Sequence, residues 1–339
     1  MPADESPWDA SVRRGLGFLH RALGPDGLPS TVLSVERDLR TPLTGIEARR
    51  YLLAAHGTDL GFEPVHEGLS AMWGLALLAP DGDRPEEREL VAALARQVER
   101  YRAGHRYGCF PQGTPFPADT DSTAVALDGL VRHGLAGPGR AAETARELLG
   151  AGARDGFGPV PLPVPVPVYW SDGAVPPQGR RNDAVAAANV LHALRLPGAR
   201  DALPHPAAEA TLRYVRVEVR NAAARHHPSP EALLHSAARA AAVHTALLDP
   251  VRQAVAERSR PFPASPLGLA LLTIAAEYTE VPDDQAARRR LLVAAQRADG
   301  SWPACAYYRA GGLPLYSGSP HLTTLFALRA LRPERGAQR

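Results

Sequence analysis

Apolar residues recur along most of the chain at the spacing of amphipathic or buried helices, and strand-like alternation is scarce. Pro and Gly mark helix ends: Gly24-Pro25 follows the first apolar segment, and Ser229-Pro230 opens another with Pro at the first helical position. We therefore expect helices over 9–23, 44–56, 66–79, 86–104, 121–135, 141–151, 183–196, 207–225, 230–248, 251–258, 266–279, 286–297 and 319–331.

These segments are of two kinds. One kind is apolar on every side and therefore predicts burial all round: 66–79, 121–135, 183–196, 230–248, 266–279 and 319–331. The other kind carries Arg and Glu at helical spacing, which predicts one solvent-exposed face: 9–23, 86–104, 141–151, 207–225, 251–258 and 286–297. The alternation predicts an all-α fold, a single (α/α)6 barrel of inner and outer helices. Residues 1–335 would form this domain and 336–339 a disordered tail.

A short corner motif recurs ahead of the buried segments, which indicates an internal repeat. Gly is followed by an apolar or aromatic residue and then Pro at Gly27-Leu28-Pro29, Gly108-Cys109-Phe110-Pro111, Gly156-Phe157-Gly158-Pro159 and Gly300-Ser301-Trp302-Pro303. Gly permits a tight exit from a helix, and a ring can pack on helix ends. A purely structural role for these corners is the simplest interpretation.

Composition narrows the function. The 339 residues are 45% hydrophobic and 22% charged, which suits a large buried core. The net charge of +2 gives no global field for nucleic acid, so we expect no nucleic-acid partner. All 38 cationic residues are Arg, which excludes a Schiff-base Lys and a P-loop. Only Cys109 and Cys305 are present, so a disulfide framework is excluded.

The chain shows no targeting signal. The polar, acidic start MPADESPWDA lacks the pattern of a signal peptide, and no apolar run reaches the roughly 18 residues of a membrane span. We expect a cytoplasmic protein with reduced thiols and no transmembrane segment.

Two motifs resemble a known family. Residues 292–302, LVAAQRADGSW, are similar to the glutamine–tryptophan repeat of squalene–hopene cyclases and related terpene cyclases. Residues 119–124, DTDSTA, resemble their acid motif, Asp-x-Asp-Asp-Thr-Ala. Segments 182–191 and 319–328 are similar to inner helices of the prenyltransferase and squalene-cyclase repeat superfamily. The resemblance implies a helical toroid and class II chemistry, in which a protonated isoprenoid cyclises as a carbocation.

This sequence departs from that pattern in two ways. Ser122 stands where the family has the last Asp of the motif. Those cyclases usually stack two toroids, whereas 339 residues have room for one. The cavity would then be closed by the chain's own loops, by a second copy in a homodimer, or by a partner chain.

The resemblance implies that Asp121 is the proton donor, Asp119 its partner, and Ser122 an orienting hydroxyl. An isolated Asp is ionised at neutral pH, but a carboxyl in an apolar pocket beside a second carboxyl can stay protonated. The helix start that follows would stabilise the carboxylate left after proton transfer. Asp, Ser and Thr are also the preferred helix caps, so a capping role alone remains open.

A carbocation cyclase also needs aromatic faces and the exclusion of water. The aromatic candidates for substrate binding gather mainly in the corners and loops, although each could simply pack: Phe110, Phe116, Tyr169, Trp170, Trp73, Trp302, Tyr307, Tyr308 and Tyr316. Alternating prolines predict an extended segment over 159–168, which would be either a lid or a docking strip for a partner.

The sequence gives weaker evidence for sites that would bind a diphosphate or a metal ion. Arg180 and Arg181 precede a helix cap and could hold a diphosphate, although with 38 Arg in the chain a solvated surface pair is the simpler interpretation. Proton transfer itself needs no cofactor, and Mg²⁺ would be required only with a diphosphate substrate. The acids Asp283-Asp284 lack the class I magnesium pattern. Asp299, Cys305 and His321 do not match the zinc spacing of protein prenyltransferases, and His226-His227 is interpreted as a solvated turn.

The leading hypothesis is a class II-type terpenoid cyclase acting on a prenyl diphosphate of 15 or 20 carbons or a related polyene. The alternative is a non-catalytic isoprenoid- or lipid-binding toroid degenerate from that family. A carbohydrate-active (α/α)6 enzyme would need two carboxylates facing each other across a polar cleft, and the loops offer few paired acids outside 119–121.

Overall fold

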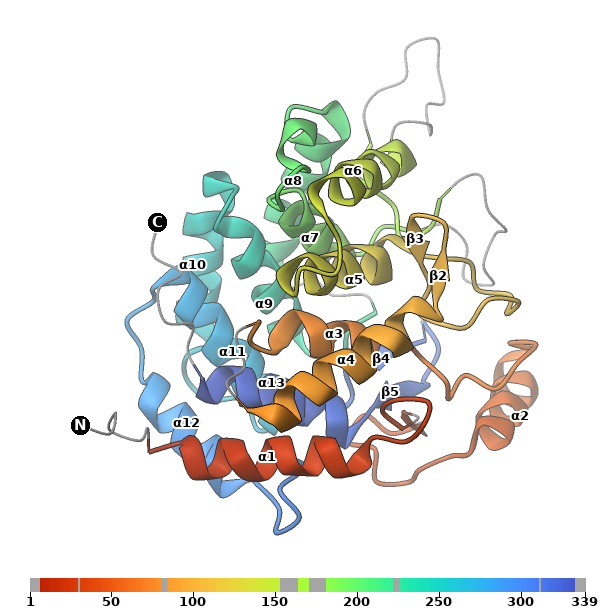
Figure 1. The fold of residues 1–339 in the computed structure, drawn as a ribbon, viewed down its shortest axis with the longest axis vertical. Helices are drawn as coiled ribbons and strands as arrows, with labels where there is room; N and C mark the ends of the chain where they lie inside the picture. The colour runs from red at the N-terminus through yellow and green to blue at the C-terminus, as the bar shows by residue number, and fades with distance from the viewer. Residues whose placement is uncertain are drawn as a thin grey trace.

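A ring of helices forms the body of the molecule (Figure 1). The computed structural model describes residues 7–29, 31–80, 84–152, 164–170, 181–221, 226–310 and 312–332. Within them, consecutive inner helices pack on one another, and the last packs on the first and closes the ring: α3 (Leu69–Leu77), α5 (Thr120–Arg132), α7 (Ala184–Ala193), α9 (Pro230–Ala241), α11 (Pro266–Thr279) and α13 (Pro320–Leu331).

A second layer of helices lies outside this ring. It consists of α1 (Asp9–Ala22), α4 (Pro85–Glu99), α6 (Pro138–Gly152), α8 (Pro206–Asn221), α10 (Leu248–Arg258) and α12 (Gln285–Ala294). Each outer helix packs on an inner one: α4 on α3, α6 on α5, α8 on α7, α10 on α9, α12 on α11 and α1 on α13. The predicted all-α (α/α)6 barrel is confirmed.

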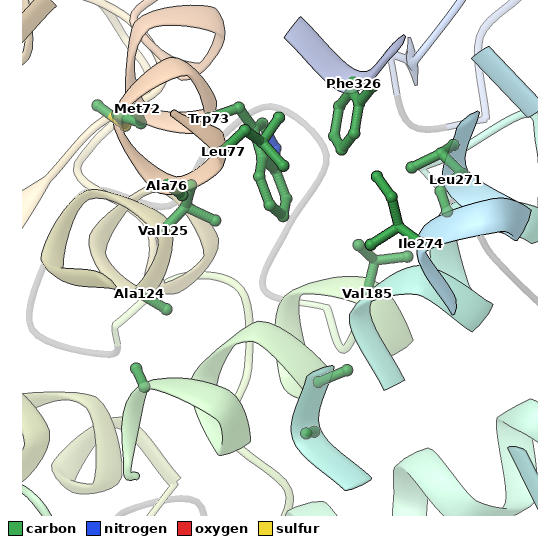
Figure 2. Packing of buried hydrophobic residues seen from close by; sticks show 14 of the residues in the cluster. Met72, Trp73, Ala76, Leu77, Ala124, Val125, Val185, Leu271, Ile274 and Phe326 are labelled. Atoms are coloured by element: carbon green, nitrogen blue, oxygen red, sulfur yellow. The ribbon is translucent and has the colours of Figure 1, made fainter. Parts of the chain in front are cut away.

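The middle of the ring is filled rather than hollow. Trp73 of α3, Phe326 of α13 and Val185 of α7 point toward the same central space (Figure 2). Tyr307 and His235 join this cluster, with ring centroids 6.3 and 5.4 Å from that of Trp73. These side chains exclude water from the barrel centre, and any ligand site has to lie beyond them, toward an end of the barrel.

Two helices end five or more residues before their predicted ends. The helix predicted over 86–104 ends at Glu99, because β2 (Arg102–Ala103) and β3 (Arg106–Tyr107) form a hairpin that turns at Gly104 with φ +66°. The helix predicted over 230–248 ends at Ala241, because His244 leaves the helical conformation at φ −105° and ψ 84°. A 3-10 turn over Thr245–Leu247 then leads into α10.

A small extra layer accompanies the barrel. It combines α2 (Gly45–His56) with a sheet in which β5 (Tyr316–Gly318) pairs with both β1 (Val32–Ser34) and β4 (Tyr308–Arg309). A capping box between Thr44 and Glu47 starts α2. Leu33, Leu52 and Leu315 give this layer its own apolar core. In Figure 1, α2 stands apart from the packed helices.

The Gln–Trp motif joins the last outer helix to the first. The Gln296 side chain accepts a hydrogen bond from Ser11 Oγ at 2.5 Å and donates to the carbonyls of Ser11 and Gly300 at 2.9 Å. The buried Trp302 indole donates to the carbonyl of Leu292 at 2.7 Å. Gly300 adopts φ +93°, and an added Cβ would lie 2.3 Å from the carbonyl oxygen of Arg14. The motif therefore closes the barrel.

Two further expectations concern the chain as a whole. Among the described residues, no helix is both long and apolar enough to cross a membrane. The predicted tail at 336–339 and the corner at Gly156 lie outside the described residues.

Candidate active site

A cavity opens where the N-terminal ends of α3, α5 and α7 meet the α2 layer. It holds about 1000 Å³ of space, part of it open to solvent. Its wall brings together many of the predicted site residues: Phe110, Phe116, Asp119, Asp121, Ser122, Tyr169 and Tyr308. Leu33, Leu60 and Leu315 extend it with apolar surface from the α2 layer, so the chain's own residues cover part of the cavity.

Asp119 is the N-cap of α5. Its carboxylate accepts hydrogen bonds from the backbone N–H of Ser122 at 2.7 Å, from Ser122 Oγ at 2.8 Å, and from the Cys109 N–H at 3.0 Å. Burial raises the pKa of Asp119 to about 6, although these donors favour its ionised form. Asp119 therefore does cap the helix, and Ser122 orients it.

Asp121 has a different environment two residues further on. It is only 7% exposed, and among the described residues its carboxyl accepts one hydrogen bond, from the Asn189 side-chain amide at 2.7 Å. Burial, and then the nearby Asp119, raise the pKa of Asp121 to about 7. A substantial fraction of this carboxyl is protonated at neutral pH, as a general acid requires.

Asn189 links Asp121 to a buried charge network. Its side-chain oxygen accepts from Arg239 at 3.2 Å, and Arg239 pairs with the buried carboxylate of Asp128. His192 lies 3.3 Å from the other oxygen of Asp128. Although burial opposes ionisation, His192 and Arg239 hold the pKa of Asp128 far below its usual range. The network fixes the Asn189 amide beneath the acid.

The interpretation of His226-His227 as a solvated turn was wrong. His227 is 4% exposed and lines the cavity, with its Nδ1 3.8 Å from Asp183 Oδ1. The turn is buried because the backbone N–H of His226 donates to Asp183 Oδ2 at 3.1 Å, and the N–H of Arg309 in β4 donates to the His226 carbonyl at 2.8 Å. Two tertiary contacts thus draw the turn inward.

The predicted aromatic residues divide between cavity and core. Phe110 and Phe116 line the cavity with ring centroids 5.3 Å apart, and Tyr169 lines it beside Asp119, which it meets in a β-bridge. Three others do not line it: Trp73 and Tyr307 belong to the central cluster beneath it, and Trp302 packs against α12.

The remaining aromatic candidates face elsewhere. The Trp170 indole donates to the Glu147 carbonyl at 2.9 Å and lies under the Arg106 guanidinium, away from the cavity wall. Tyr316 is half-buried in β5 and does not line the cavity. Neither residue is placed to contact a ligand there.

The described part of the Pro-rich segment, 164–168, forms neither helix nor strand and contributes to the cavity wall. The Val168 carbonyl accepts from the N–H of Thr120 at 2.8 Å, and Thr120 Oγ1 donates to the Pro167 carbonyl at 2.9 Å. Val168 itself lines the cavity. Residues 159–163 lie outside the described part of the chain.

The charges on the described cavity wall are mainly carboxyl groups. Glu67, Asp119, Asp121 and Asp183 line it, together with the guanidinium of Arg309. Burial raises the pKa of Glu67, whose carboxylate accepts from the Ser70 N–H at 2.9 Å. Of the predicted diphosphate site, Arg181 is exposed and does not line the cavity, and Arg180 lies outside the described residues.

The zinc triad weighed above is not assembled. Among the described residues, no three His, Cys, Asp or Glu side chains gather as a metal site would require. Asp299 accepts from the Ser301 N–H at 2.9 Å, and His321 stacks on Phe18 with centroids 5.2 Å apart. Cys109 and Cys305 are both free thiols.

Comparison with known proteins supports this architecture at the level of fold. The structure is similar to a protein from Actinoplanes, with a TM-score of 0.67 and 19% identity over 95% of this chain and 98% of that one. It is also similar to type II terpene cyclase MstE from Scytonema in complex with geranylgeranyl dihydroxybenzoate, with a TM-score of 0.65 and 14% identity over 95% and 96% of the two chains. The chain has the fold of a type II terpene cyclase.

A longer solved structure shows the same fold over about half of its length. The ent-copalyl diphosphate synthase from Streptomyces platensis matches with a TM-score of 0.52 and 19% identity, over 83% of this chain and 53% of that one. MstE, in contrast, is matched over nearly its whole length, so a type II terpene cyclase of this size exists. No family model and no curated protein matches this sequence.

Sequence reasoning missed several residues of this cyclase-fold site. The available signal was a polar residue within a helix that is otherwise apolar. This applies to Asp128, Asn189, His192 and Arg239. Asn189 lies within the segment 182–191 that resembles an inner helix, but only the packing of the ring brings Asn189 to the acid and Arg239 to Asn189.

Proposed function

We propose that this protein is a class II-type terpenoid cyclase that protonates an isoprenoid through Asp121 and so starts carbocation cyclisation. The observation that carries the proposal is the environment of Asp121: a buried carboxyl on a largely apolar cavity, with one hydrogen-bond donor and a pKa of about 7.

The surrounding groups suit that reaction. Asp119 is held as a cap by three donors, so it supports Asp121 rather than competing for the substrate. After proton transfer, the N-terminus of α5 stabilises the Asp121 carboxylate. Phe110, Phe116, Tyr169 and Tyr308 place aromatic rings on the cavity wall, where they can stabilise a cation without attacking it.

The substrate class is proposed from the cavity and the fold neighbours. MstE was solved with geranylgeranyl dihydroxybenzoate, a prenyl chain on an aromatic acid. The copalyl diphosphate synthase is named for a diphosphate product. The four carboxyl groups of the described wall favour a head group of low charge. A diphosphate would enter with Mg²⁺ as part of the substrate, whereas proton transfer itself needs no cofactor.

The test is turnover of farnesyl diphosphate and geranylgeranyl diphosphate, each with Mg²⁺, and of geranylgeranyl dihydroxybenzoate. Products are analysed by mass spectrometry after extraction, with dephosphorylation where needed. We expect a cyclic product from at least one probe and a loss of about 100-fold or more in Asp121→Asn. Asp249→Asn, on the exposed start of α10, is the matched control.

Each other outcome has a distinct meaning. Equal turnover by wild type and Asp121→Asn would reduce Asp121 to a structural residue and overturn the proposal. Binding of all three probes without conversion would favour the alternative, a non-catalytic isoprenoid-binding protein.

A further inference from the structure

His227 is a buried base on the cavity wall with no hydrogen bond to either ring nitrogen. It is 4% exposed, and neither Nδ1 nor Nε2 has a partner among the described residues. A buried polar group without a partner is costly, so such a group calls for an explanation. A neutral imidazole has one nitrogen lone pair, and here no described residue donates a hydrogen bond to it.

The ring is held in place rather than loosely packed. Its centroid lies 5.0 Å from those of Tyr307 and Tyr308. The backbone on its N-terminal side is fixed twice, because Asp183 accepts the His226 N–H and the Arg309 N–H donates to the His226 carbonyl. Asp183 in turn caps α7, accepting from the N–H groups of Val185 and Ala186.

The electrostatics suit a base that is neutral at rest. Burial lowers the pKa of His227 to about 4, so the ring is uncharged at neutral pH. The carboxylate of Asp183 lies 3.8 Å from Nδ1, too far for a hydrogen bond but close enough to stabilise an imidazolium once it forms. Although burial opposes ionisation, the pKa of Asp183 lies below its ordinary value, since its carboxylate accepts the backbone N–H groups of Ala186 and His226.

The acid and the base contact different residues of α7 and its cap. Asn189 of α7 binds the acid Asp121, and Asp183 at the start of α7 faces His227. These two partners are six residues apart, which is about 9 Å along a helix axis. Asp121 and His227 therefore line the same cavity beside two different residues of α7, so one bound polyene can reach both.

We propose that His227 is the base that ends the cyclisation, an inference that rests on the proposed function. A C–H bond next to the final cationic carbon breaks, its electron pair becomes the new C=C bond, and the proton goes to the imidazole lone pair. Asp121 has supplied one proton and His227 has received one, so the net reaction is an isomerisation. Solvent then takes the proton from His227 and restores the one on Asp121.

Other groups nearby are poorer bases. Both carboxyl oxygens of Asp183 already accept backbone N–H groups. Burial raises the pKa of Tyr308 far above its ordinary value, so its phenol stays neutral and weakly basic. Among these three residues of the cavity wall, His227 is the one with a basic nitrogen lone pair that accepts no hydrogen bond from a described residue.

The test compares His227→Phe and His227→Leu with wild type on the three probes above. Phe retains a ring against the two tyrosines and Leu does not, so a packing effect would differ between them, whereas both lack the lone pair. The matched control is His321→Phe, because His321 is a buried imidazole stacked on Phe18 away from the cavity, with its pKa also lowered by burial to about 4. Circular dichroism and thermal unfolding confirm that each variant is folded.

We expect both His227 variants to consume substrate within a few-fold of wild type, because protonation by Asp121 is intact. The share of the major alkene should fall about tenfold or more, replaced by water-captured alcohols or double-bond isomers. An unchanged product distribution in a folded His227 variant would overturn the assignment and leave the cyclase proposal standing. No cyclised product from wild type with any probe, or turnover by Asp121→Asn equal to wild type, would overturn both.

Discussion

Asn189 and Asp121 meet in the interior of the ring, where the Asn189 amide nitrogen donates to Asp121 Oδ1 at 2.7 Å. The Asn189 oxygen accepts from Arg239, so the network assigns the N–H groups of this amide to the side of Asp121. Because Oδ1 already receives a hydrogen bond, the proton of a neutral Asp121 resides on Oδ2. This is the oxygen for which the described residues supply no donor, and it is therefore the one available to a substrate.

Activity should fall as the pH rises. The acid works only when protonated, and the pKa of Asp121 lies at about 7. We expect kcat/KM to be level below pH 6 and to decrease about tenfold per pH unit well above pH 7. A pH–rate profile on whichever probe is turned over measures this. A profile that is flat to pH 9 would contradict the assignment of Asp121 as the acid.

Removal of the Asn189 amide should move that profile to higher pH. The hydrogen bond from Asn189 favours the ionised form and lowers the pKa of Asp121, so its loss raises that pKa. In Asn189→Ala we expect the decreasing limb to shift upward by up to about one pH unit, with a lower plateau because the carboxyl is less well oriented. Asn221→Ala, at the exposed end of α8, should leave the limb unchanged.

Asp121→Asn should stabilise the fold, and more so at high pH. Burial raises the pKa of Asp121 from 3.8 to about 7, so the folded protein binds more protons than the unfolded chain between these values. The unfolding free energy therefore decreases as pH rises through this window, and above it the ionised carboxylate is a cost. We expect Asp121→Asn to unfold a few degrees above wild type at pH 8, with a much smaller difference at pH 4. Thermal unfolding of both proteins at the two pH values tests this, and an equal difference would contradict it.

The charge network beneath the acid should be needed for folding. Arg239 is 4% exposed and pairs with the buried Asp128. Arg239→Met leaves that carboxylate without its main partner, which costs about 3–5 kcal/mol. Urea unfolding at pH 7 measures the loss. Arg213→Met breaks an exposed pair with Glu209 on α8 and should change stability little. Similar effects of both substitutions would show that Asp128 finds another partner.

Trp302 should matter for stability and not for the product. It is fully buried and ties the corner to the Leu292 carbonyl. Trp302→Phe loses this hydrogen bond and some packing, at about 1–3 kcal/mol. Phe116→Leu instead removes a ring from the cavity wall, and should change the product distribution. Chemical denaturation and product analysis of both variants separate the two roles, and a changed product profile in Trp302→Phe would contradict the structural assignment.

Much of the barrel could be predicted because its helices differ in the periodicity of their side chains. α7 is nearly all Ala and Val and α4 carries charge at helical spacing, and these patterns reflect burial on all sides or on one side. The end of α4 could not be predicted in this way. The β2–β3 hairpin depends on Arg102 and Tyr107 pairing across Gly104, and Arg102 continues the charged pattern of the helix.

The candidate acid site could likewise be predicted from the sequence only in part. The resemblance of residues 119–124 to the family's acid motif implied an acid pair, and their position before an apolar helix indicated a cap. The distinct roles of the two carboxyls could not be predicted, because Asp119 is fixed by the Cys109 backbone and Asp121 by Asn189 from the next inner helix.

The sequence by itself determined which segments are helices, which of them are inner and which outer, and where an acid could stand, because periodicity and capping are local properties of the chain. Only the tertiary structure decided which groups face the cavity. His227 looked like part of a solvated turn, yet Asp183 and Arg309 draw that turn inward. Trp302 was a candidate for substrate binding, yet its indole packs against α12 and donates a hydrogen bond to the Leu292 carbonyl. The physical reason is that burial and pairing, which set the protonation of Asp121 and His227, arise from contacts between residues far apart in the chain.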